Sequence, residues 1–175
     1  MKDNKLFVEK IVDAVGDSLP ADFDKEGLAG LLMRAAAEEI QAWYQYLAPT
    51  KFAVGPERQP IVQNFLKTAF DELDDHFNKL MERLAQLDVD VTPLTDLWNL
   101  RNLSDAYVAT QAPYDVRQLL EKAMVSEEKA IRTYKEILDF CNGKDAVTYE
   151  LARHIMADEE EHLTNFHDFL NDISQ

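Results

Sequence analysis

Four long stretches of this chain repeat apolar residues every three or four positions, and each carries a glutamate inside its apolar face. Repetition at this interval marks one side of an α-helix. The stretches are residues 24–48, 61–88, 114–141 and 145–173. Since an apolar helix face is buried against its neighbours, the glutamates are drawn into the core with it. The pattern restricts the chain to an all-α fold whose interior holds acidic groups.

Proline, glycine and aspartate mark the ends of these helices. Pro49 follows the first stretch and Pro60 precedes the second, which fits helices that stop before a proline and start at one. Gly143 and Asp145 suit the end of the third helix and the start of the fourth. Residues 89–113, if extended, can run the whole length of the second helix. We therefore predict a four-helix bundle with a long crossover between helices two and three.

The composition restricts the cellular compartments and the binding partners that suit this chain. A length of 175 residues suits one domain over residues 1–175, of which residues 1–23 are an extension that could hold a short helix. The single cysteine, Cys141, fits a reducing compartment, and we find neither a secretory signal nor a membrane span. The formal net charge of −15 disfavours nucleic acids. We expect a cytoplasmic protein that binds neither DNA nor membranes.

The inward acids lie near the midpoints of the helices, and two helices add an inward histidine. These candidate metal ligands are Glu39, Glu72, His76, Glu127, Glu159 and His162. A buried carboxylate that is neither paired nor bound to a cation is strongly unfavourable. Two divalent cations would neutralise four carboxylates, and mixed carboxylate and imidazole ligands suit Fe(II), Mn(II) or Zn(II). The pattern therefore predicts a dinuclear metal site.

Residues beside these candidates are assigned by their angle around the helix. Asp158, Glu160 and Glu161 point about 100° or more away from the centre of the apolar stripe, so we expect them to face solvent. His154 and His167 lie off the line of Glu159 and are expected near the surface. Four aromatic residues are expected in the core, namely Trp43, Tyr44, Tyr46 and Tyr134.

These residues resemble the ferritin-like superfamily. The segment EIQAWYQYLA (39–48) resembles the first ferritin helix. The segment DEEEHL (158–163) resembles the Glu-x-x-His of the fourth helix in bacterioferritins and rubrerythrins. Three further segments resemble, more narrowly, the Dps-like proteins of archaea and anaerobic bacteria, which are also called thioferritins. These segments are ELDDHFNKLMERLAQL (72–87), EEKAIRTYKEI (127–137) and GKDAVTYELA (143–152). The resemblance covers nearly the whole chain after residue 24 and implies a di-iron centre inside one subunit.

The resemblance also implies a function. A ferroxidase of this type oxidises Fe(II) with O₂ or H₂O₂ at two iron ions and stores Fe(III) in a homo-oligomeric cage, here favoured to have twelve subunits, with twenty-four as the alternative. Mn or Zn could replace iron. Glu127 and a second-helix glutamate would be shared between the ions, with Glu159 and His162 on one of them. The alternative is another di-metal carboxylate enzyme, such as a peroxidase, a manganese catalase-like protein or an oxygenase.

The chain departs from the family pattern in three places. Helix two usually carries Glu-x-x-His, but Leu73 stands at the glutamate position, so Glu72 would reach the metals by its i, i+4 spacing or through a π-bulge, with Asp75 as a substitute. The thioferritin cysteine pair is absent, which leaves the role of Cys141 open. Asp74 stands where a similar haem-binding bacterioferritin would carry methionine, so we expect no haem.

Overall fold

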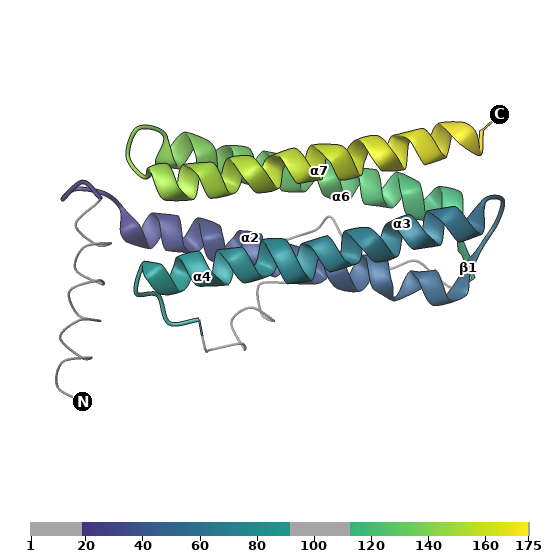
Figure 1. Ribbon diagram of the computed structural model, residues 1–175, viewed down its shortest axis with the longest axis horizontal. Coiled ribbons are helices and arrows are strands. Elements are labelled where there is room, and N and C mark those ends of the chain that lie inside the picture. The colour runs from purple at the N-terminus through teal and green to yellow at the C-terminus, as the bar shows by residue number, and fades with distance from the viewer. Residues whose placement is uncertain (1–18, 92–112, 175) are drawn as a thin grey trace.

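The computed structural model describes residues 19–91 and 113–174, and these form four long helices packed side by side (Figure 1). The first is α2 (Lys25–Leu47). The second is continuous and consists of α3 (Arg58–Phe70), a π-helix η2 (Asp71–Phe77) and α4 (Asn78–Gln86). The others are α6 (Val116–Cys141) and α7 (Ala146–Asp172). Each predicted helix is confirmed to within one turn, whereas the extension up to residue 18 lies outside the described residues.

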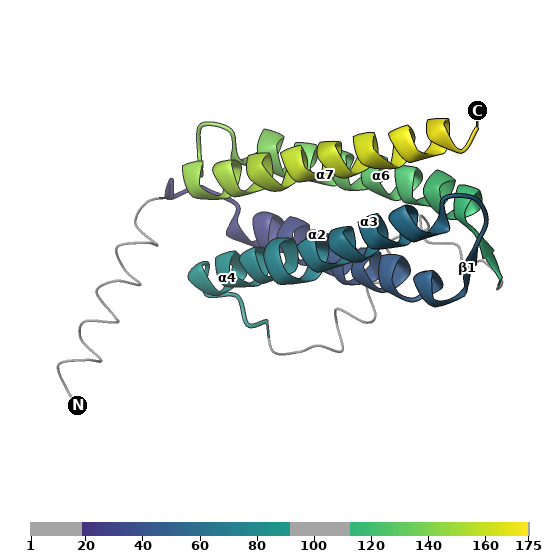
Figure 2. The same cartoon turned by 45° about the vertical axis from the view of Figure 1, so that its right-hand side comes forward.

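Contacts at the two ends of the bundle establish the helix directions. At one end, β1 (Ala53–Val54) after α2 pairs in parallel with β2 (Tyr114–Asp115) before α6. At the other end, Arg83 of α4 donates a hydrogen bond of 2.7 Å to Asp145, just before α7. The second helix and α6 therefore run in the same direction, as Figures 1 and 2 show. The predicted bundle with a long crossover is confirmed, although residues 92–112 of that connection lie outside the described part.

Aspartate side chains begin three of the helices. Asp24 accepts a hydrogen bond of 2.8 Å from the backbone N–H of Gly27 at the start of α2, and Asp115 accepts one of 2.8 Å from Arg117 at the start of α6. Asp145 accepts two such bonds of 3.1 Å at the start of α7. Each carboxylate satisfies backbone donors that have no partner within the helix. These caps set where the helices start, and so which residues face inward.

The apolar core is divided into two parts along the bundle. One part contains Leu28 and Leu32 of α2 with Leu84 of the second helix. The other contains Tyr46 of α2, with Phe65 of the second helix among its members. On every helix the predicted metal ligands lie between these two parts in the sequence. The bundle therefore has a polar layer at its middle, closed by apolar packing on both sides.

One of the four aromatic residues expected in the core is exposed. Tyr46 and Tyr134 are in the core as predicted, Trp43 is half-buried, and Tyr44 is 64% exposed, so the prediction for Tyr44 was wrong. Tyr44 stands about 100° around the helix from Trp43, which is enough to leave the buried face. Within the described ranges, no helix combines the length and the apolar character needed to cross a membrane.

Candidate metal centre

Each of the four helices brings one buried glutamate to the polar layer. All six predicted ligands are at most 2% exposed, namely Glu39, Glu72, His76, Glu127, Glu159 and His162. Asp75, the substitute considered for helix two, does not join them. Its side chain is 42% exposed, and its Oδ2 lies 2.7 Å from Lys79 Nζ. The acid that helix two contributes to the polar layer is thus Glu72.

The six side chains form two overlapping groups, each able to hold one metal ion. One group is Glu39, Glu72, His76 and Glu159, and the other is Glu72, Glu127, Glu159 and His162. Within each group, one ligand atom per residue lies within 4.8 Å of the others. Glu72 and Glu159 belong to both groups. Glu127 belongs to the second group alone, and the expectation that Glu127 is shared between two ions while Glu159 is confined to one stays a prediction.

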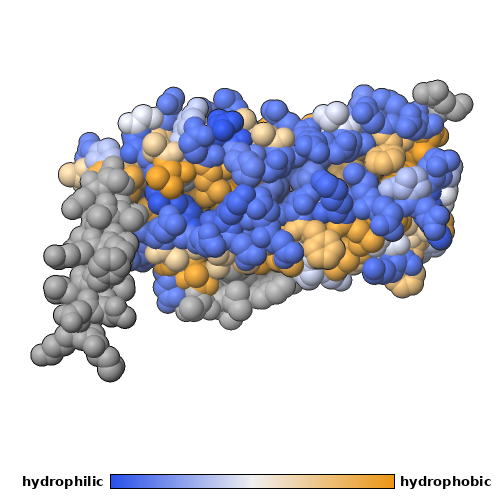
Figure 3. All heavy atoms as spheres, in the orientation of Figure 1, coloured by the Kyte–Doolittle hydropathy of each residue, from blue (hydrophilic) through white to orange (hydrophobic). Residues whose placement is uncertain are grey.

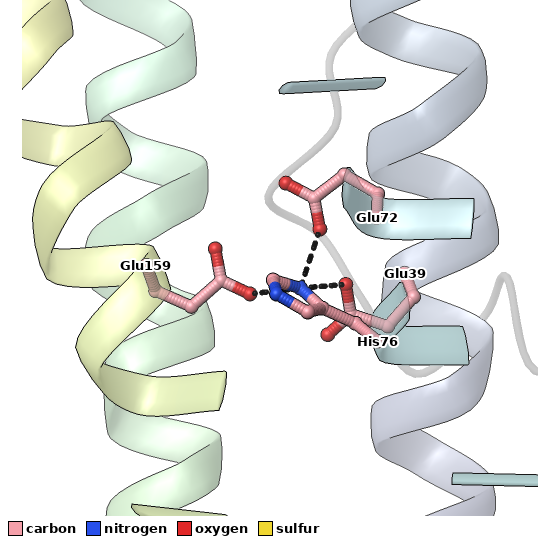
Figure 4. A group of neighbouring side chains, drawn as sticks. All are labelled: Glu39, Glu72, His76 and Glu159. Atoms are coloured by element: carbon pink, nitrogen blue, oxygen red, sulfur yellow. Dashed lines mark ion pairs between the residues drawn. The ribbon is translucent and has the colours of Figure 1, made fainter. Parts of the chain in front are cut away.

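His76 lies at the centre of the first group. Figure 4 shows its ring between Glu159 of α7 on one side and the glutamates of α2 and η2 on the other. Its Nδ1 atom lies 3.1 Å from Glu159 Oε1 and 3.4 Å from both Glu39 Oε2 and Glu72 Oε2. His162 is placed similarly, with Nδ1 3.2 Å from Glu159 Oε2. Both imidazoles thus direct Nδ1 at the carboxylates.

Several polar atoms of this layer are buried without a hydrogen bond. Among the described residues, no partner with hydrogen-bond geometry is found for Glu72 Oε1, Glu159 Oε1 or His76 Nδ1. Buried polar atoms are satisfied in the great majority of cases, so each exception needs a reason. Carboxylate oxygens and an imidazole nitrogen are the donor atoms that Fe(II), Mn(II) and Zn(II) accept. The residues present therefore fit a pair of such ions.

The π-helix brings Glu72 and His76 into the same group. In η2 the backbone hydrogen bonds close wider turns than in an α-helix, which accommodates one extra residue. As a result, Glu72 and His76, which are four residues apart, belong to the same group. On the α-helix α7, Glu159 and His162 share a group at a spacing of three residues. The expectation of a π-bulge at this spacing is confirmed.

Two buried tyrosines hold terminal carboxylates of the centre. The hydroxyl of Tyr134 on α6 donates to Glu39, and that of Tyr46 on α2 donates to Glu127 across 2.8 Å. A hydrogen bond to a ligating carboxylate fixes its orientation and strengthens the site. From the sequence, both tyrosines were expected only as core residues. The signal available was that a buried tyrosine hydroxyl needs a partner.

The outer nitrogens of the two histidines face a different set of acids. His76 Nε2 lies 3.5 Å from Asp158 Oδ2, and His162 Nε2 lies 3.4 Å from Asp71 Oδ2. Carboxylates in this position commonly orient histidines that bind metals. The prediction that Asp158 faces solvent was only partly right, because its side chain is 35% exposed, while Glu160 is exposed as expected.

Burial and mutual charge shift the pKa values of the side chains in the polar layer. Burial and the charge of Glu159 hold the pKa values of Glu72 and Glu127 well above their usual range. Burial acts to raise the pKa of Glu159 as well, but the adjacent imidazoles of His162 and His76 outweigh it and lower that pKa. Burial acts to lower the pKa of His76, but the surrounding carboxylates raise it. Binding of two divalent cations would therefore release protons.

Known proteins are similar to this chain in sequence and in fold. The ferritin-like domain model matches residues 29–175. The DNA protection during starvation protein of Pyrococcus furiosus is 32% identical over 151 residues, which cover 84% of this chain and 78% of that protein.

Solved structures extend the similarity in three dimensions. A dodecameric thioferritin, the bacterioferritin-related protein of Bacteroides fragilis, is 30% identical, with a TM-score of 0.81 and 95% of each chain covered. The bacterioferritin of Desulfovibrio desulfuricans shares the fold at 24% identity, with a TM-score of 0.67 over 86% of this chain and 81% of that one. The predicted resemblance to Dps-like members of the ferritin-like superfamily is confirmed. The chain belongs to the ferritin-like domain family.

Proposed function

We propose that this protein oxidises Fe(II) at the two overlapping carboxylate and histidine groups and stores the product as Fe(III). The observation that carries the proposal is that Glu72 and Glu159 belong to both groups and that each has a buried carboxylate oxygen without a hydrogen-bond partner among the described residues. A surplus of buried carboxylates is costly to the fold unless cations bind there. The arrangement is thus better suited to loading and unloading metal than to stabilising the bundle.

Iron is the substrate in this reaction. Two Fe(II) ions give one electron each to the same oxidant, so that two Fe(II), one H₂O₂ and two protons yield two Fe(III) and two waters. With O₂ as oxidant, the same two electrons and two protons yield H₂O₂. Glu39 and His76 would hold one ion, Glu127 and His162 the other, and the shared glutamates both. Paired delivery of electrons avoids one-electron oxygen radicals.

Storage needs an enclosed space, and we propose that copies of this chain assemble into a cage. The Bacteroides fragilis relative is a dodecamer, and the present chain covers 95% of it at 30% identity, which favours twelve subunits over twenty-four. Large apolar side chains also remain at the surface of the single chain, including Phe52 at 62%, Tyr44 at 64% and Phe70 at 65% exposed. Neighbouring subunits would cover such residues.

DNA contact is not part of the proposal. The Pyrococcus furiosus relative is named for DNA protection, and removal of Fe(II) together with peroxide protects DNA without binding it. The formal net charge of −15 disfavours association with the phosphate backbone. We further propose that the protein works in the cytoplasm, carries no haem, and uses iron in preference to Mn or Zn.

The test compares two neighbouring glutamates on α7. Fe(II) is added in air, and oxidation is followed by absorbance in the near ultraviolet for wild type, Glu159→Gln and Glu160→Gln. Glu159 is 0% exposed and belongs to both groups, while Glu160 is exposed and belongs to neither. Wild type and Glu160→Gln should oxidise Fe(II) well above the buffer rate, and Glu159→Gln should lose most of that rate.

Size and capacity separate storage from the other di-metal enzymes. A shell of hundreds of kilodaltons that retains many Fe(III) ions per chain supports storage. A monomer or dimer that retains no more than two would instead point to a peroxidase, a manganese catalase-like protein or an oxygenase. Wild-type oxidation no faster than the buffer blank would refute the ferroxidase proposal itself.

A further inference from the structure

A third group of side chains that could hold a metal ion lies outside the centre, where η2 faces α7. It consists of Asp75, His154 and Asp158, and none of these belongs to the two buried groups. His154 Nε2 lies 3.7 Å from Asp75 Oδ2 and 3.6 Å from Asp158 Oδ2. Hydrophilic side chains cover the middle of this face of the molecule (Figure 3). The group is open to solvent, since the side chain of His154 is 51% exposed.

A buried histidine nitrogen points at this outer group from inside the protein. His76 is 0% exposed, and its Nε2 has no hydrogen-bond partner among the residues that the structure describes. That nitrogen lies 3.5 Å from Asp158 Oδ2, the same oxygen that approaches His154. Asp75, Asp158 and His76 also line one pocket of about 210 Å³, to which His162 contributes as well. The outer group is therefore connected to the centre and is more than a set of surface acids.

We propose that Asp75, His154 and Asp158 bind one divalent transition-metal cation. Two carboxylates balance the charge of one such ion, and an imidazole nitrogen favours Fe(II), Mn(II) or Zn(II) over Mg(II) or Ca(II). Lys79 now provides positive charge at this place, with Nζ 2.7 Å from Asp75 Oδ2. A divalent ion replaces that single charge by a double one, so Lys79 competes with the metal and lowers its affinity.

The position of the site indicates what it does, given the proposed ferroxidase function. Asp158 Oδ2 is near His154 Nε2 on the outside and near His76 Nε2 on the inside, so one carboxylate contacts both the captured ion and a ligand of the centre. The pocket between η2 and α7 has both centre histidines in its lining. The outer site is thus placed to capture Fe(II) and supply it to the centre.

Zinc binding tests the site without any redox chemistry. Metal-free wild type, His154→Gln and His167→Gln are dialysed against Zn(II), and bound zinc per chain is measured. His167 is a matched control because it is on the same helix, is 57% exposed and has an aspartate oxygen at 3.6 Å, but belongs to none of the three groups. We expect three zinc ions per chain in wild type and in His167→Gln, and two in His154→Gln.

Two further measurements make the result decisive. Crystals soaked in MnCl₂ should show an anomalous difference peak between the three side chains, and Lys79→Gln should tighten binding of the third zinc ion. In Fe(II) oxidation, His154→Gln should raise KM severalfold and leave kcat unchanged. Equal zinc stoichiometry in wild type and His154→Gln, with no manganese peak, overturns the site. An unchanged KM overturns its supply role, and an absence of oxidation in all variants counts against the ferroxidase proposal alone.

Discussion

The buried carboxylates should have opposite effects on stability with and without metal, and Glu127→Gln separates the two. Glu127 is 1% exposed, and its pKa is raised by burial and by the charges of Glu159 and Glu72. Glutamine has nearly the same shape, and its carbonyl can still accept the 2.8 Å hydrogen bond from Tyr46. The variant should therefore be more stable than wild type when metal-free and less stable when loaded.

The magnitude follows from burial and from ligand linkage. An uncompensated buried polar group costs about 1–3 kcal/mol, and each kcal/mol shifts Tm by about 2–4 °C in a chain of this size. Because the folded pKa of Glu127 lies above its unfolded value, the penalty grows as pH rises above about 4.3 and vanishes below it. A metal present at a hundredfold excess over its Kd stabilises the folded protein by about 2.7 kcal/mol. A variant that no longer binds the metal loses this stabilisation.

Calorimetry with and without Zn(II) measures both effects. At pH 7 in EDTA, Glu127→Gln should melt higher than wild type at equal protein concentration, and this gain should fade towards pH 4. In excess Zn(II) the order should reverse. Glu128→Gln is the matched control. Glu128 follows Glu127 directly, but its side chain is 53% exposed and its Oε2 lies 3.8 Å from Arg132 Nη1. Its stability should stay within about 0.5 kcal/mol of wild type in both conditions.

Either of two results would refute the proposed role of Glu127. If Glu127→Gln lowers the Tm of the metal-free protein, the buried carboxylate stabilises the fold and its burial carries no net penalty. If Zn(II) raises the Tm of Glu127→Gln as much as that of wild type, Glu127 is not a ligand.

Four other outcomes are expected. Tyr134→Phe removes a hydroxyl that donates to a glutamate of the centre, so stopped-flow Fe(II) oxidation should slow by about 10–100-fold. Arg83→Ala leaves Asp145 buried without its guanidinium partner at 2.7 Å, and urea unfolding should show a loss of about 3–5 kcal/mol. Burial acts to raise the pKa of Asp145, but hydrogen bonds from Thr148 and Arg83 lower it overall, so this stabilisation should disappear as pH falls below about 4. Burial raises the pKa of Cys141 to about 12, so an aromatic disulfide reagent at pH 7 should label it far more slowly than in unfolded protein.

Helical register made most of the centre predictable from sequence. A helix repeats every 3.6 residues, so a glutamate in line with apolar neighbours is buried and one a single position away is not. Glu159 and Glu160 illustrate this, with the first fully buried and the second exposed. The same logic selected His162 over His167. Because every helix gave a consistent answer, both the bundle and its six inward acidic and histidine side chains could be anticipated.

Contacts between helices were harder to predict from the sequence, because helical register gives the angle of a side chain around its own helix axis but no distance to the neighbouring helix. The membership of Glu159 in both groups and of Glu127 in only one depends on how α6 and α7 are rotated against η2. The approach of Asp158 to His76 depends on the same rotation. The two-residue pairing of β1 with β2 is too short to leave a sequence pattern. These features arise only when the helices pack.

The π-helix also bears on how this family tolerates insertions and deletions. Ferritin-like di-iron proteins use Glu-x-x-His, whereas Glu72 and His76 here have one residue more between them. Were η2 α-helical, the additional residue would turn everything after it by about 100° and expose Leu80 and Leu84, which are now buried. The wide turn confines the extra residue to Asp71–Phe77 and leaves the packing of α4 intact. Deleting Leu73 should therefore restore both the common spacing and a regular helix, so a gene that lost this one codon could still encode a working protein.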